Sequence, residues 1–153
     1  MKKINGMVRM MAIPIIDLHC DALLGILERG DNFTNAPTLD VNYEKLQAGN
    51  VMAQAFAIFV FPEWSLEEKR AAAYKQVAHF QALIEANPNM VQVKNWEDFH
   101  TLHPGQIGAF LTIEGVDFFG GDLDFWYEFY TFGVLSIGLT WNNPNEAADG
   151  LHS

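Results

Sequence analysis

Long, unbroken apolar runs are the feature that most restricts how this chain can fold. Three of them occur, at residues 13–16, 51–61 (with Gln54 as the only polar residue) and 107–113, and a similar fourth run at 134–139 carries Ser136 and Gly138. A strand with one face in water alternates apolar and polar residues, whereas a parallel strand that is covered on both faces does not. These runs therefore predict parallel strands buried inside an α/β protein.

Helical patterns fill the gaps between the runs. Ser65 and Glu68 fit a capping box, and apolar residues then recur at helical spacing until Asn87 and Pro88 end the helix. Shorter helical segments are expected at 22–28, 41–48, 96–102 and 123–132, with a brief strand near 90–93. This alternation of strand and helix again predicts an α/β fold with a parallel sheet.

The length of the chain limits how much of such a fold it can form. A closed (β/α)8 barrel of the TIM type needs about 250 residues, and this chain has 153. It supplies about the first four β/α units, so we expect either a small open sheet or part of a barrel. We assign residues 1–12 to a poorly ordered leader and 13–153 to the folded domain.

Composition excludes several classes of partner. The formal net charge is −10, from 19 acidic residues against 9 Lys and Arg, and we find no basic patch that would bind nucleic acid. Cys20 is the only cysteine, so no internal disulfide can form. No segment approaches the roughly 18 apolar residues of a membrane span. We therefore expect a cytoplasmic protein.

The first apolar run leads into a histidine and an aspartate that could bind a metal ion. His19 and Asp21 lie two residues apart, so in an extended segment both side chains point the same way while Cys20 faces elsewhere. An imidazole and a carboxylate are both common zinc ligands. In the alternative interpretation Asp21 caps the following helix and His19 is merely packed.

A carboxylate follows the third apolar run. Glu114 comes directly after uncharged residues, and Gly115 would allow a ligand or metal to approach the backbone closely. A buried carboxylate must be paired or metal-bound, because burying it alone costs several kcal/mol. Alternatively, Glu114 already lies in solvent beyond the strand end.

The fourth run is followed by a loop rich in amides and turn-forming residues, at 138–150. On its own it could be an ordinary surface loop. However, this loop, Glu114 and the pair His19 and Asp21 all follow apolar strands, and α/β barrels assemble their active sites at the carboxyl ends of their strands. The three segments are therefore expected to meet.

Three stretches resemble successive signatures of the membrane (renal) dipeptidase family, in its bacterial branch, and they occur in the same order and at matching separations. They are the segments 15–23 (IIDLHCDAL), 111–115 (LTIEG) and 138–150 (GLTWNNPNEAADG). The similarity extends from about residue 13 to the end of the chain, and corresponds to the amino-terminal half of the family's barrel.

The resemblance implies a metal-dependent (β/α)8 barrel that holds two zinc ions and hydrolyses dipeptides. By the matching motifs, His19 and Asp21 would bind the first zinc, and Glu114 would bridge both ions and serve catalysis through a bridging, metal-activated water. Trp141 and Asn142 are expected to contact the substrate. Trp141 stands where animal members carry a histidine that contacts the substrate carbonyl, so that histidine's role does not transfer.

The family takes two further zinc-binding histidines, a substrate-binding arginine and a catalytic aspartate from the second half of its barrel, beyond Ser153. We therefore expect the 153 residues alone to bind metal weakly, to show little turnover, and to form a homodimer or self-associate through open barrel edges. Two alternatives stay open at this point: another metal-dependent amidohydrolase, or a non-catalytic remnant of a truncated gene.

Overall fold

The computed structural model describes residues 13–152, so the expected leader at 1–12 lies outside the described part. Within that part, five strands form one sheet in which every pairing is parallel. The strands are β1 (Ile15–Asp17), β2 (Val51–Ile58), β3 (Met90–Gln92), β4 (Ile107–Glu114) and β5 (Val134–Gly138). The α/β class and the parallel sheet predicted from the apolar runs are therefore confirmed.

The two long strands, β2 and β4, form the middle of the sheet. They pair with each other from Ala53 and Gly108 to Ile58 and Ile113, and β1 flanks β2. Both β3 and β5 lie along the other edge of β4: β3 pairs with its first residues, and β5 with its last residues. The carboxyl ends of β1, β2, β4 and β5 consequently lie at one end of the sheet.

Only the central strands are covered on both faces as predicted. Six of the eight residues in each of β2 and β4 are buried. The first strand begins two residues later than expected and leaves Ile15 and Ile16 about half-exposed, and Leu135 and Ser136 of β5 are exposed as well. The prediction of full burial is thus wrong for β1 and β5, because both are edge strands with a neighbour on one side only.

The helices lie close to their predicted positions. They are α1 (Ala22–Arg29), α2 (Tyr43–Ala48), α3 (Leu66–Ala86), α4 (Trp96–Thr101) and α5 (Asp124–Phe132). The capping box is present, with the Ser65 hydroxyl accepting from the Glu68 amide. In contrast, α2 starts two residues later than predicted, because the Asn42 side chain accepts from the Lys45 amide and so caps the helix.

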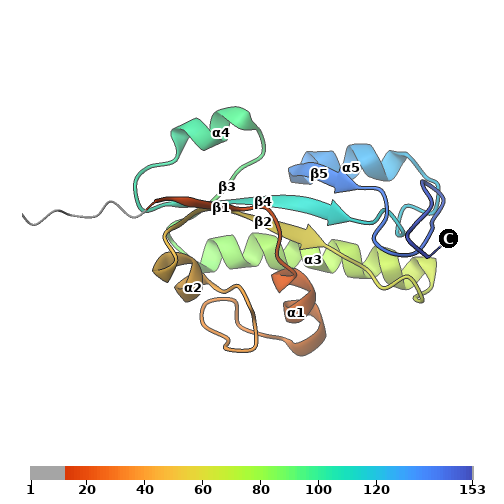
Figure 1. Ribbon diagram of the computed structural model, residues 1–153, viewed down its shortest axis with the longest axis horizontal. Helices are drawn as coiled ribbons and strands as arrows, with labels where there is room; N and C mark the ends of the chain where they lie inside the picture. Colours follow the sequence, from red (N-terminus) through yellow and green to blue (C-terminus); the bar gives the residue numbers. More distant parts are fainter. Residues whose placement is uncertain (1–12, 153) are drawn as a thin grey trace, which may run out of the picture.

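The main core lies between the sheet and α1, α2, α3 and α5. Phe56 and Ile58 of β2 pack there with Phe80 of α3. A smaller cluster on the opposite face of β2 and β4 contains Ala53 and Phe110, and α4 packs against it. Figure 1 shows α3 running along one side of the sheet and α4 on the other. Along the described residues, no helix combines the length and apolar character that a bilayer crossing requires.

Candidate metal centre

The turn between β1 and α1 carries the first two residues of the site. The Asp17 carboxylate accepts a hydrogen bond from the backbone amide of His19 at 3.2 Å, and the Cys20 carbonyl accepts from the Ala57 amide of β2 at 3.0 Å. These bonds fix the turn against the sheet. Cys20 is buried in the main core and so faces away from His19 and Asp21, which are exposed on either side of it.

Glu114 is the last residue of β4 and lies across the sheet from that turn. It belongs to the strand, rather than lying beyond its end, and its side chain is partly buried, with 28% exposed. Burial raises the pKa of the Glu114 carboxyl, the His19 imidazole opposes that rise, and the Asp21 carboxylate adds to it. A carboxylate in this position is stabilised by any neighbouring positive charge.

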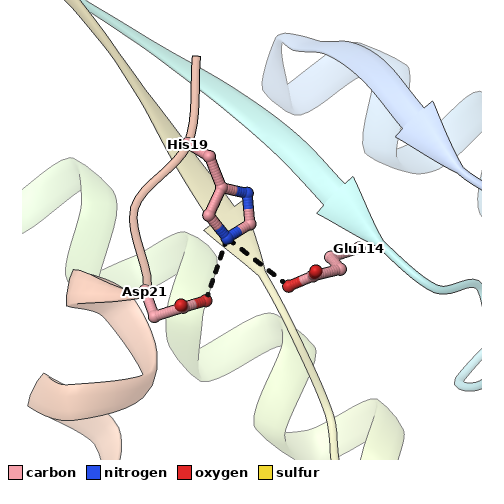
Figure 2. Close-up of side chains that lie close together, drawn as sticks. All are labelled: His19, Asp21 and Glu114. Carbon is pink, nitrogen blue, oxygen red and sulfur yellow. Dashed lines mark ion pairs between the residues drawn. The ribbon is translucent and has the colours of Figure 1, made fainter. Parts of the chain in front are cut away.

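The three side chains meet at one point. His19 Nε2 lies 3.5 Å from Asp21 Oδ1 and 3.6 Å from Glu114 Oε2, and one ligand atom from each residue lies within 4.8 Å of the other two. Figure 2 shows the imidazole pointing between the two carboxylates. Both distances exceed those of a good hydrogen bond, so the imidazole approaches both carboxylates without bonding closely to either.

The structure does not support the alternative in which the Asp21 side chain caps α1. Asp21 occupies the N-cap position of α1, but its side chain accepts no capping hydrogen bond. It is directed at His19 instead, as Figure 2 shows. His19 is 48% exposed on its side chain, so it is not a packed core residue either. Both groups remain available to a ligand.

These donors fit a zinc ion. Zinc binds imidazole nitrogen and carboxylate oxygen at about 2.0–2.2 Å, so two ligands of a tetrahedral ion lie roughly 3.4 Å apart. The separations of 3.5 and 3.6 Å between donor atoms are close to that value. Three protein ligands are also the usual number at a catalytic zinc site with an open position.

A cavity of about 370 Å³ opens beside His19 and Asp21, between α1 and residues 38–41. Arg29 lines it, but its guanidinium is held by Asp31 at 2.7 Å, and Thr38 donates a hydrogen bond to the same carboxylate. The arginine is therefore tied to the wall of the cavity and its charge is already matched.

The loop after β5 lies next to Glu114 but serves partly as structure. Gly115 has a φ of +83°, and a side chain there would meet Asp117 and the backbone nitrogen of Trp141. The close approach that Gly115 permits is thus made by the chain itself, rather than by a ligand as predicted. The Asn145 side chain donates to the Leu139 carbonyl at 2.8 Å and holds the loop closed.

The two predicted substrate contacts lie in this loop. Trp141 is half-exposed, and its ring packs against Phe59 with centroids 5.3 Å apart. Asn142 is partly exposed, and its carbonyl accepts from the His152 amide. The sequence analysis did not identify Phe59 as a residue near the site. Its position near the end of the second apolar run was the signal that could have indicated this.

A parallel α/β sheet with an imidazole and two carboxylates gathered at its strand ends is an arrangement that metal-dependent barrel hydrolases use. The comparisons with known proteins agree. Residues 3–153 match the family described as membrane dipeptidase, peptidase family M19, and the chain belongs to that family. No curated protein sequence matches it.

Solved structures resemble the fold at low sequence identity. The crystal structure of the dipeptidase AC, a metallopeptidase of family M19, matches with a TM-score of 0.78 and 22% sequence identity. The match covers 88% of this chain and 44% of the dipeptidase chain. A metallopeptidase from Rhodobacter sphaeroides, liganded with a phosphinate mimic of the dipeptide L-Ala-D-Ala, has a TM-score of 0.77 and 20% identity over 88% and 47%. The probable dipeptidase PvdM from Pseudomonas aeruginosa has a TM-score of 0.69 and 21% identity over 90% and 35%.

This chain therefore spans less than half the length of those structures. Over residues 13–152 the sheet is open and has two unpaired edges, which fits the partial barrel that the sequence predicted. Family membership also favours the dipeptidase over the other metal-dependent amidohydrolases that the motifs alone left open.

Proposed function

We propose that this chain is the amino-terminal part of a zinc-dependent dipeptidase, in which His19, Asp21 and Glu114 hold the metal. The observation that carries the proposal is the approach of one imidazole nitrogen to two carboxylates, at 3.5 and 3.6 Å. Family membership supports it, as does the dipeptide mimic bound to the similar Rhodobacter sphaeroides enzyme.

Each residue has a distinct part in the proposed site. His19 supplies a nitrogen and Asp21 an oxygen to one ion, while Glu114 has two oxygens and can bridge a pair of ions. Zinc held there would supply Lewis-acid chemistry, polarising a peptide carbonyl and lowering the pKa of a bound water. Because Glu114 is partly buried beside a second carboxylate, positive charge at the site would offset the cost of its burial and add to the stabilisation that His19 already provides.

The substrate we propose is a dipeptide, with Trp141 and Asn142 near it. Both residues follow β5 at the same end of the sheet as Glu114, which pairs with Gly138. We also propose that the protein acts in the cytoplasm, since Cys20 forms no disulfide and is the only cysteine. The acidic net charge of −10 argues against nucleic acid as a partner.

Zinc binding tests the site directly. Titration calorimetry on the purified chain should show weak but saturable zinc binding, and His19→Ala should weaken it at least about tenfold because a first ligand is lost. His103→Ala is the matched control, since His103 is exposed and lies before β4, at the opposite end of that strand from Glu114. Equal zinc affinity in His19→Ala and the parent would contradict the proposal.

A dipeptide assay tests the reaction. We expect L-Ala-D-Ala to bind only when zinc is present, and its hydrolysis by the 153 residues to be slow, because three ligand residues are few for two ions. Equal dipeptide binding with and without zinc would contradict the proposal that the metal takes part in the reaction. Rapid turnover would show that the described residues hold the complete catalytic site.

We further propose that the chain self-associates through its sheet edges. The outer edges of β1 and β5 are unpaired within the described residues, and Ile16, Leu18 and Leu135 expose apolar surface beside them. Unpaired edges with apolar neighbours favour pairing between chains. Light scattering should therefore show a dimer or larger species, and a stable monomer at high concentration would contradict this.

A further inference from the structure

Four aromatic side chains form a continuous row at the carboxyl end of the sheet. Phe59 lies directly after β2, and its ring contacts Trp141 edge-on at 5.3 Å and Phe61 at 5.5 Å. Phe61 in turn contacts Trp64 at 5.0 Å. We call Trp141, Phe59, Phe61 and Trp64 the aromatic row.

The row lies beside the candidate metal centre. Ile58 pairs with Ile113 in the parallel register, so the next residues, Phe59 and Glu114, are neighbours on the same face of the sheet. Trp141 follows β5, which flanks β4 on its other side. The contact between Phe59 and Trp141 therefore crosses the end of β4, directly beyond Glu114.

Hydrogen bonds hold both ends of this contact in place. The buried Gln76 side chain of α3 accepts from the Phe59 amide at 3.2 Å and donates to the Phe59 carbonyl at 2.6 Å. On the other side, Asn145 donates to the Leu139 carbonyl and accepts from the Ala147 amide, which fixes the loop that carries Trp141. The row is thus formed before any ligand arrives, and a preformed wall lowers the entropic cost of binding.

Trp141 is the member of the row that exposes the most surface. Phe59 is 7% exposed, whereas Trp141 is 50% exposed. The Trp141 backbone lies against Gly115, the residue after Glu114, so its half-exposed indole adds a flat apolar surface beside the metal centre. Aromatic rings cover such a surface well, since they prefer edge-to-face and offset contacts with other rings.

We propose that the aromatic row is the specificity wall of the site and selects dipeptides that carry an aromatic side chain. This inference rests on the proposed function, because it assumes that a dipeptide lies at the metal centre. Trp141 makes the direct contact, Phe59 supports its ring, and Gln76 positions Phe59. The expected ligand is therefore a dipeptide with one phenylalanine rather than one with small side chains alone.

Competition between dipeptides in the presence of zinc tests this. Binding of Phe-Ala and Ala-Phe is compared with binding of Ala-Ala by calorimetry, which needs no turnover. We expect at least one aromatic dipeptide to bind about 3–10-fold more tightly than Ala-Ala, the range typical of an aromatic contact. Trp141→Ala should abolish the difference, and Trp141→Phe should retain most of it.

Trp126→Ala is the matched control, because Trp126 is also an exposed tryptophan, at 44%, but lies on α5 away from the row. It should leave the preference unchanged. Circular dichroism should confirm that each variant is folded. The inference is overturned if the parent chain binds all three dipeptides equally, or if Trp141→Ala keeps the preference.

These outcomes separate the two proposals. Zinc-dependent binding of Ala-Ala without any preference for phenylalanine leaves the dipeptidase proposal standing and removes the specificity wall. Failure of every dipeptide to bind in the presence of zinc removes the proposed function, and with it the inference that depends on it.

Discussion

The two faces of the sheet differ in what they carry. On the face towards α3, β2 places the large residues Phe56 and Ile58 in the main core. On the opposite face the same strand carries Ala53 and Ala55, which belong to the smaller cluster, and Glu114 lies on that face too. Apolar burial and therefore stability are concentrated on one face, while the groups that can do chemistry are on the other.

The same division runs through three consecutive residues. Cys20 is buried on the helix side, and burial raises the pKa of its thiol to about 12, so it acts as a small apolar residue. His19 and Asp21, on either side of it, are exposed at the candidate metal centre. A single turn thus anchors itself with one side chain and presents the two others to a ligand.

The largest loss of stability is expected on the sheet face that packs against α3. Phe80 of α3 is fully buried and packs edge-on against Phe56 at 5.5 Å. Phe80→Ala should lower the free energy of unfolding by about 3–5 kcal/mol, because it removes a whole ring and leaves a cavity. Urea denaturation followed by circular dichroism measures the loss.

Phe110→Ala is the matched substitution on the other face. Phe110 is also buried, but its cluster is small and is covered chiefly by Phe99 and Leu102 of the α4 segment. The surroundings can collapse more easily there, so the loss should be smaller than for Phe80. An equal or larger loss for Phe110→Ala would show that the two faces contribute alike to stability.

The sequence predicts the sheet face that packs against α3 better than it predicts the candidate metal centre. Unbroken apolar runs locate β2 and β4, and the Ser65 capping box locates the start of α3, because both signals are local. The exposure of Ile16 on β1 was missed, since an apolar run does not reveal whether a strand lies at an edge. The contact between Phe59 and Trp141 was missed too, because it depends on the register of three strands.

The residues that the motifs selected do lie together in the structure, but for a partly different reason than the one given from the sequence. His19 and Asp21 were expected to share the direction of an extended strand, but β1 ends at Asp17 and both residues lie in the turn that follows. Parallel topology still brings that turn to Glu114. Their role as metal ligands remains a prediction.

A second prediction concerns Glu114, on the face opposite α3. Glu114→Gln should weaken zinc binding about 10–100-fold, the size of effect seen when a metal site is disturbed. It should leave the unfolding free energy in the absence of zinc unchanged or slightly higher, because a neutral amide costs less to bury than a carboxylate beside Asp21. Calorimetry and urea denaturation measure the two quantities.

Glu85→Gln on α3 provides the control, as Glu85 is exposed on the helix side. It should change neither quantity. If Glu114→Gln destabilised the protein strongly without altering zinc affinity, Glu114 would be a structural residue. The assignment of stability to one face of the sheet and ligand binding to the other would then be wrong.

The smallest effect is expected at the start of α3, where stability rests on hydrogen bonds rather than on burial. Ser65→Ala removes the hydroxyl that accepts from the Glu68 amide and should lower the unfolding free energy by about 1 kcal/mol. Zinc affinity should not change, because α3 contributes no ligand. Ser65→Asp is the control, since aspartate also caps helices and should restore most of the loss.

This loss should also depend on pH. Hydrogen bonds from the Ser65 side chain and backbone amide lower the pKa of Glu68 from its ordinary value of 4.5. A carboxyl group with a lowered pKa stabilises the fold above its unfolded-state pKa, and this contribution disappears as the pH falls through the folded-state value. The stability difference between the parent and Ser65→Ala should therefore be full at pH 7 and narrow below about pH 4.5. NMR titration should find the Glu68 pKa closer to its ordinary value in Ser65→Ala, and an unchanged pKa would mean that the capping box does not hold the carboxylate.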